Sequence, residues 1–306
     1  MPARFGFFSC GFLVVTLSLS GAAGCSGADT SSSSGTTGGQ GGTTATAGAG
    51  GSTAGGGQGG TTTSTTLTTG TGGGGGRQFT FTNNCPDPVW AGTLNGNPKY
   101  LLPEGGGFKL DPGASHSFTR PTEWGGRFWG RTGCVFDAQG MGPCETADCG
   151  NKEKCGGAGG KPPATLAEFQ LAGFGGKDFY DISLVDGYNL PMRITPVPGT
   201  FTISDPNNPY DCGSPGCSSD LNATCPAELQ QKNAGGEVVA CLSACEKFGT
   251  DAYCCKGANN TPDTCPPTSY SMIFKDACPT AYSYAYDDQS STFTCLGGSY
   301  EITFCP

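Results

Sequence analysis

The cysteines constrain this chain more than any other feature of the sequence. The 306 residues include 18 cysteines, and 16 of them lie beyond residue 84. An even, dense set of cysteines in an exported chain indicates a disulfide framework, whereas the same residues in a reducing compartment more often bind metal or react. We therefore expect eight disulfides formed outside the cytoplasm, no metal site and no cofactor.

The amino terminus has the pattern of an export signal. Arg4 precedes an apolar stretch from Phe5 to Leu19, and small residues lead to Cys25. Residues 1–25 are thus predicted to be a signal peptide, because the stretch is short for a membrane span. Its end is similar to a bacterial lipobox, in which the cysteine is lipidated, so we expect the membrane to be contacted only through Cys25. Ordinary cleavage nearby, which would give a secreted protein, is the alternative.

Residues 26–76 consist almost entirely of Gly, Thr, Ser and Ala. Such a segment has too few apolar side chains to offset the entropy of ordering, which predicts a disordered linker. Residues 77–306 are left to fold as one unit, and we expect a monomer.

The formal net charge of −9 excludes nucleic acid as a probable class of partner, since phosphate backbones would be repelled. Neutral sugars are compatible with it. The single histidine, His116, follows the turn-forming residues DPGAS, where a surface role is favoured over catalysis.

Short β-rich runs separated by Gly and Pro predict a mainly β fold, an antiparallel sandwich. These runs are residues 79–82, 117–119, 127–129, 179–184, 201–203 and 300–304. Apolar residues spaced by three and four predict one helix over residues 236–248, ended by Gly249.

Several longer motifs are similar to those of the thaumatin-like family, which includes the pathogenesis-related thaumatin and osmotin-like proteins. They are WGRTGC (129–134), PCETADC (143–149), KPPATLAEF (161–169), KDFYDISLVDGYNLPM (177–192), YCC (253–255) and ITFCP (302–306). The resemblance covers residues 77–306. The linker and the lipobox-like end are foreign to plant members and indicate a bacterial cell-envelope lipoprotein.

The resemblance implies a thaumatin-like sandwich formed by residues 77–131, 161–218 and 279–306. A small lobe (132–160) and a helical, disulfide-rich lobe (219–278) are inserted in it. The implied disulfides are Cys85–Cys305, Cys134–Cys144, Cys149–Cys155, Cys212–Cys295, Cys217–Cys278, Cys225–Cys241, Cys245–Cys254 and Cys255–Cys265.

The resemblance also implies an acidic cleft that binds β-1,3-glucan. The matching positions are Arg127, Glu168, Asp181, Asp186 and Asp287, with Asp288 as an alternative to Asp287. Two tyrosines next to these positions, Tyr188 and Tyr286, are candidates for stacking on sugar rings, although aromatic residues in such folds more often belong to the core.

Three functions compete for this arrangement. The first is binding of β-glucan or a related cell-wall polysaccharide, with an antifungal effect as one implied consequence. The second is a weak endo-β-1,3-glucanase with Glu168 as acid and Asp181 as its partner, because glycoside hydrolysis requires one protonated and one ionised carboxyl group. The third is a structural or protein-contacting surface domain, in which the acidic residues only form salt bridges and caps.

Overall fold

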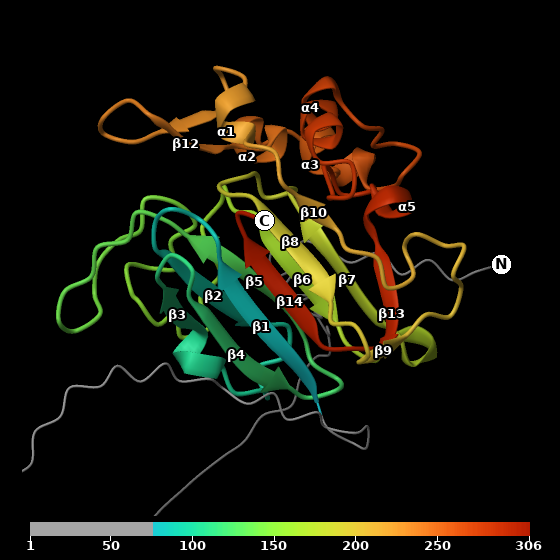
Figure 1. The fold of residues 1–306 in the computed structure, drawn as a ribbon. Helices are drawn as coiled ribbons and strands as arrows, with labels where there is room; N and C mark the ends of the chain where they lie inside the picture. Colours follow the sequence, from blue (N-terminus) through green and yellow to red (C-terminus); the bar gives the residue numbers. More distant parts are fainter. Residues whose placement is uncertain (1–75) are drawn as a thin grey trace, which may run out of the picture. The chain divides into compact units, whose positions relative to one another are not determined.

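The computed structural model describes residues 76–306. The predicted signal peptide, the lipidation site at Cys25 and the predicted linker up to residue 75 lie outside the described residues. The described chain is mainly β, and most of its helical segments gather at one end of the strands (Figure 1).

Two sheets form the sandwich (Figure 1). The five-stranded sheet has the order β10 (Gly216–Cys217), β8 (Met192–Pro196), β14 (Tyr300–Phe304), β1 (Arg77–Asn83) and β4 (Ser115–Arg120). The seven-stranded sheet has the order β3 (Gly107–Leu110), β2 (Val89–Asn95), β5 (Gly125–Arg131), β6 (Leu166–Gln170), β7 (Asp178–Ser183), β13 (Phe293–Gly297) and β9 (Phe201–Thr202). Strand pairing is antiparallel as predicted, except that β1 and β14 run parallel.

Aromatic side chains from both sheets build the core between them. The Phe79 ring of β1 lies 5.2 Å from the Phe128 ring of β5 and 4.9 Å from the Phe169 ring of β6, measured between centroids. Tyr300 of β14 lies 5.1 Å from Phe169. All four are buried, and burying each such side chain contributes about 1.5–3 kcal/mol.

The helical lobe contains the hairpin β11 (Gln230–Lys232) and β12 (Val238–Cys241), and the helices α1 (Leu221–Thr224), α2 (Ala244–Phe248), α3 (Asp251–Cys254) and α4 (Ser269–Ala277). Helix α5 (Asp288–Ser291) and three 3-10 turns, Pro103–Gly106, Phe174–Gly176 and Gly257–Asn259, complete the elements of the described chain. None of these helices has the length and apolar character needed to cross a bilayer.

The predicted helix over residues 236–248 is wrong in its first half. Val238 and Val239 belong to β12, as β-branched residues favour. The helix begins only after Ser243, whose side chain accepts a hydrogen bond from the Glu246 amide, and it ends at Gly249 in the left-handed conformation. The predicted end of the helix is therefore confirmed.

Eight disulfides join the same pairs of cysteines that the resemblance implies: 85–305, 134–144, 149–155, 212–295, 217–278, 225–241, 245–254 and 255–265. The widest, Cys85–Cys305, spans 220 residues and ties the ends of the neighbouring strands β1 and β14. Most of the others lie within one lobe, where local crosslinks take the place of a large core.

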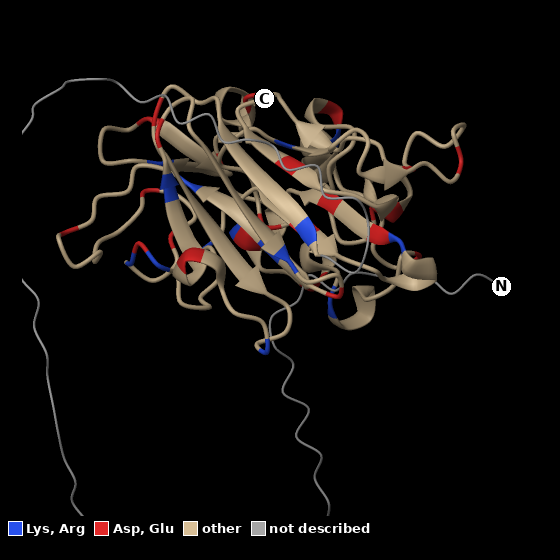
Figure 2. Cartoon of the chain, turned by 60° about the horizontal axis from the view of Figure 1, so that its bottom comes forward, with Lys and Arg blue, Asp and Glu red and all other residues tan. Residues whose placement is uncertain are grey.

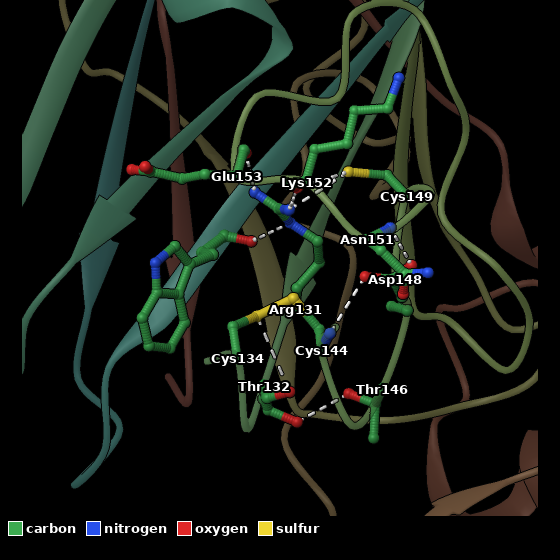
Figure 3. The surroundings of a disulfide bond; sticks show 12 residues. Arg131, Thr132, Cys134, Cys144, Thr146, Asp148, Cys149, Asn151, Lys152 and Glu153 are labelled. Carbon is green, nitrogen blue, oxygen red and sulfur yellow. Dashed lines mark hydrogen bonds between the residues drawn. A yellow bond between two sulfur atoms is a disulfide. The ribbon is translucent and has the colours of Figure 1, made fainter. Parts of the chain in front are cut away.

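A buried arginine organises the small lobe (Figure 3). Arg131, at the end of β5, donates hydrogen bonds to the backbone carbonyls of Lys152 at 2.8 Å and Glu153 at 2.7 Å. It also donates to the carbonyls of Trp90 and Ala91 in β2. These bonds fasten the lobe to strands β2 and β5 of the seven-stranded sheet.

Candidate functional site

A row of charged side chains crosses three neighbouring strands of the seven-stranded sheet. Arg127 of β5 pairs directly with Glu168 of β6, and Glu168 pairs directly with Asp181 of β7. Directly opposed residues of antiparallel strands project from the same face. We call Arg127, Glu168 and Asp181 the charged row. Charged residues are sparse on the strands, so a row of three neighbouring ones is unusual in this sheet (Figure 2).

The charged row lies on the face of the sheet that is turned away from the sandwich core. The next pair along β6 and β7, Phe169 with Tyr180, belongs to the core cluster. Since successive side chains alternate between faces, Glu168 and Asp181 must point to the opposite face. In the other direction, two residues before Glu168 on β6, Leu166 pairs with Trp129 of β5 in a second apolar cluster that includes cysteines of the small lobe. The row therefore begins where the small lobe ends.

Small residues let the strands approach closely beside Arg127. A Cβ atom on Gly126 would lie 2.4 Å from the Leu94 carbonyl oxygen and 2.5 Å from the Trp124 ring. Phe128, on the other side of Arg127, is buried in the core. The GGRFWGR sequence of β5 thus fixes the backbone of Arg127 while leaving its side chain on the outer face.

Arg127 lies between two carboxylates without a close hydrogen bond to either. Its Nη1 atom is 4.0 Å from Glu168 Oε1 and 3.8 Å from Asp186 Oδ2. These distances are longer than a hydrogen bond, which leaves donors and acceptors available. The exposed fractions of the three side chains are 28%, 22% and 23%, so solvent and ligands can reach them.

Burial raises the pKa of Glu168 to about 7. The positive charge of Arg127 lowers this pKa, the negative charge of Asp186 raises it, and a hydrogen bond with the Ser183 side chain lowers it. Desolvation also raises the pKa of Asp186, against the lowering effect of Arg127. Near neutral pH, Glu168 therefore exchanges between its acid and its carboxylate form.

Asp181 is the most enclosed member of the charged row, with an exposed fraction of 2%. Desolvation raises its pKa well above the ordinary value, and the negative charges of Glu168 and Asp288 raise it further. Its Oδ1 atom is buried and has no hydrogen-bond partner within the described part of the chain. These properties disfavour the ionised form of Asp181.

The structure separates the roles of Asp287 and Asp288. Asp287 Oδ2 accepts hydrogen bonds from the Ser283 amide and hydroxyl, and lies 3.0 Å from Lys275 Nζ. Asp287 thus ties its own loop together, and its place in the cleft stays a prediction. Asp288 accepts a hydrogen bond from the Tyr282 hydroxyl at 2.8 Å, and its charge acts on Asp181. Asp288 is thus the residue beside the charged row.

The two tyrosine candidates also differ. Tyr188 is buried, and its hydroxyl donates to the Ser219 carbonyl oxygen at 2.9 Å. The prediction that it stacks on sugar is wrong, because its ring is enclosed in the core cluster. Tyr286 is partly exposed and stays a prediction.

Three residues near the charged row were not predicted from the sequence. Ser183 follows Asp181 by two positions, so the alternation of β7 could have placed it on the same face. Glu246 of α2 lies close enough for Asp186 to raise its pKa, although desolvation is the larger cause. Tyr282 carries no local signal that would reveal its bond to Asp288.

Other parts of the described chain offer little chemistry. No group of three or more His, Cys, Asp or Glu residues between residues 76 and 306 is arranged to hold a metal ion. A polar cavity of about 170 Å³ lies away from the charged row, lined among others by Glu145, Asp148, Lys161 and Gln231.

The two-sheet sandwich and its eight disulfides define a disulfide-stapled β-protein, and so many disulfides fit a place outside the cytoplasm. The thaumatin family model matches residues 83–306, and the chain belongs to this family. It is 60% identical over 228 residues to a pathogenesis-related protein 5 of Arabidopsis thaliana, covering 74% of this chain and 90% of that one. It is 56% identical over 229 residues to a glucan endo-1,3-beta-glucosidase of Prunus avium, covering 74% and 89%. A solved thaumatin-like xylanase inhibitor aligns at 23% identity with a TM-score of 0.38, covering 74% and 99%.

Proposed function

We propose that the charged row and Asp186 bind β-1,3-glucan or a related cell-wall polysaccharide. The observation that carries this proposal is the partly exposed group of Arg127, Glu168 and Asp186, whose charges approach one another only to 3.8–4.0 Å. Sugar hydroxyl groups can donate to carboxylates and accept from a guanidinium group. Neighbouring strands lie about 4.8 Å apart, so the row spans about 10 Å and is longer than one sugar ring.

The comparisons support the class of ligand. A relative that is 56% identical is named a glucan endo-1,3-beta-glucosidase, which indicates a protein that acts on β-1,3-linked glucan. The acidic balance of the chain, with a net charge of −9, favours a neutral polysaccharide over an anionic one.

Retention on insoluble β-1,3-glucan tests the binding proposal. The wild-type domain should be retained, and Arg127→Met and Asp186→Asn should each reduce retention at least tenfold. Asp263→Asn removes an equal charge from an exposed position in the helical lobe and should leave retention unchanged. Equal retention of all four proteins would mean that the glucan is bound elsewhere.

The glucanase alternative is favoured by one specific observation, the pKa of about 7 on a partly exposed Glu168. This is the property required of a general acid that protonates a glycosidic oxygen. Asp181 was the expected partner, but its burial disfavours the ionised form that a base or nucleophile needs. Asp186 is more exposed and lies beside Arg127, so it is the better ionised partner.

Release of reducing ends from a soluble β-1,3-glucan tests the catalytic reading. Glu168→Gln should abolish release while the protein still binds the insoluble polymer. Release that persists unchanged in this variant would assign the activity to a contaminant. If the wild type shows neither retention nor release, the structural or protein-contacting reading is the one that stands.

We further propose that the domain is held at the cell envelope by a lipid on Cys25 and separated from the membrane by the linker. The motif before Cys25 and the composition of residues 26–76 support this setting. The mass of the amino-terminal peptide of the processed protein tests it, because a lipidated Cys25 adds the mass of its acyl chains. An unmodified terminus would show a secreted protein.

A further inference from the structure

Asp181 is a buried carboxyl group between two other carboxyl groups. It is only 2% exposed, and its Oδ1 atom has no hydrogen-bond partner in the described structure. A buried, unpaired carboxylate would be costly, since no donor offsets its loss of water. A carboxylic acid at the same place costs less and can donate its proton to a neighbour.

On one side of Asp181 lies Glu168, its direct partner across the β6–β7 pair. The Cβ atoms of such a pair are separated by about 4.5–5.5 Å, so the charge of one carboxyl group acts on the protonation of the other. Arg127 lies beyond Glu168 and favours the negative charge on Glu168 over a negative charge on Asp181.

On the other side of Asp181 lies a fixed hydrogen-bonded group. The backbone of Tyr282 is bonded to β7 through Tyr282 N to Ile182 O and Leu184 N to Tyr282 O, both 2.8 Å. Its buried side chain donates to Asp288 and also hydrogen-bonds the Thr292 hydroxyl. Asp288 is therefore held close to Asp181 as an acceptor of a hydrogen bond.

We propose that Glu168 and Asp181 hold one proton between them, that Asp288 and Tyr282 are positioning residues for this pair, and that the charged row binds its neutral polysaccharide only while this shared proton is present. The inference rests on the proposed binding function, and it specifies the protonation state in which the site binds the polysaccharide. In this state the Glu168 carboxylate accepts hydrogen bonds from sugar hydroxyl groups. The protonated Asp181 stays neutral beside it.

The charges around the pair are consistent with this assignment. Arg127 from β5 faces Glu168 from one side, and Asp288 from α5 faces Asp181 from the other. Asp186 from the segment after β7 adds a negative charge next to Glu168, and Glu246 from α2 lies next to Asp186. Three acidic neighbours against one guanidinium group oppose the loss of the last proton from the pair.

The decisive variant is Asp181→Asn, because an amide keeps the shape and the donor of the protonated acid but cannot ionise. Binding of a soluble β-1,3-glucan oligosaccharide is measured by calorimetry between pH 5 and pH 10. In the wild type, affinity should fall about tenfold per pH unit once the shared proton is lost. At the pH of maximal wild-type affinity, Asp181→Asn should bind within about threefold of the wild type, and its alkaline decline should disappear.

A second variant, Asp288→Asn, keeps the proposal testable if Asp181→Asn fails to fold. Removal of the negative charge beside Asp181 makes ionisation of the pair easier, so the alkaline decline should move to lower pH by about one unit. Asp263→Asn, an exposed change of equal charge, should not move it. Loss of binding by a folded Asp181→Asn at the pH of maximal wild-type affinity, or an unmoved decline in Asp288→Asn, would overturn the proposal.

The experiment separates this inference from the binding proposal on which it rests. Arg127→Met should lose affinity at every pH if the charged row binds the sugar at all. Should the wild type bind no oligosaccharide, the binding proposal fails. An NMR titration of the carboxyl carbons in the free protein would then test the inference by itself. We expect two well-separated titration steps for Glu168 and Asp181, whereas one common step near pH 4 would contradict the inference.

Discussion

Two arginines on β5, four residues apart and on the same face of the strand, show how differently one side chain can be used. Arg131 is fully buried, and each end of its guanidinium group donates to backbone carbonyls 2.7–2.8 Å away. Arg127 keeps 28% of its side chain exposed and approaches its acidic neighbours only to 3.8–4.0 Å. The first is a completed structural contact, whereas the second leaves hydrogen-bonding capacity for a ligand.

The difference arises from what covers each residue rather than from the strand itself. Residues 132–160 fold back over Arg131 and offer it carbonyl groups, and Trp129 marks the edge of this cover. Beyond Trp129 the sheet presents Arg127, Glu168 and Asp181 instead. The structural arginine therefore has all its hydrogen-bond partners within the protein, whereas the candidate functional arginine does not.

The largest effect is expected from Arg131→Met. The change leaves the carbonyls of Lys152 and Glu153 without their donor, and each unsatisfied buried group costs about 1–3 kcal/mol. We expect the free energy of unfolding, measured by denaturant titration with the disulfides intact, to fall by about 3–5 kcal/mol. A loss below about 1 kcal/mol would show that water replaces the guanidinium group, and the contrast between the two arginines would fail.

A smaller, pH-dependent effect is expected from Glu168→Gln. The pKa of Glu168 is raised in the folded protein to about 7 from the ordinary value of 4.5, so the folded state holds this proton more tightly than the unfolded state does. Its contribution to stability is present below about pH 4.5 and is lost as pH rises towards about 7. The wild type should therefore lose up to about 3 kcal/mol over this range relative to Glu168→Gln.

Denaturation curves of both proteins at pH 4 and pH 8 check this prediction. The two should be nearly equal at pH 4, and Glu168→Gln should be the more stable at pH 8. The opposite order at pH 8 would mean that the Glu168 carboxylate is stabilised by Arg127 more than it is penalised by burial. Arg127 and Glu168 would then form a stabilising structural contact, as Arg131 does.

Several strands and the crosslinks of this fold could be predicted from the sequence, but other strands, among them the central β6, could not. Phe79 to Thr82 and Tyr300 to Phe304 show β-rich patterns, and both form strands. Strand β6, with the sequence LAEFQ, has no β-branched residue and becomes a strand through its partners on both sides. Val238 and Val239 were assigned to a helix because apolar spacing alone cannot separate a helix from a strand next to one.

The candidate site was predicted in part, through motifs that the resemblance supplied. Arg127, Glu168 and Asp181 are far apart in sequence, and only the strand register shows that they form one row. Sequence proximity misled the prediction for Tyr188, since two residues of separation from Asp186 say nothing about the direction of a ring in a loop. For the same reason Asp287 and Asp288 could be separated only by their hydrogen bonds.

The smallest effect on stability is expected from Arg127→Met, the counterpart of the change at Arg131. Partly exposed ion pairs at 3.8–4.0 Å contribute little, so the free energy of unfolding near pH 6 should change by less than about 1 kcal/mol. The same change should raise the pKa of Glu168 from about 7 to a higher value, because Arg127 is the charge that lowers it. NMR titration of the Glu168 carboxyl carbon measures this shift. A large loss of stability without any change in this pKa would make Arg127 a second structural arginine and remove the main support for a binding site on this face.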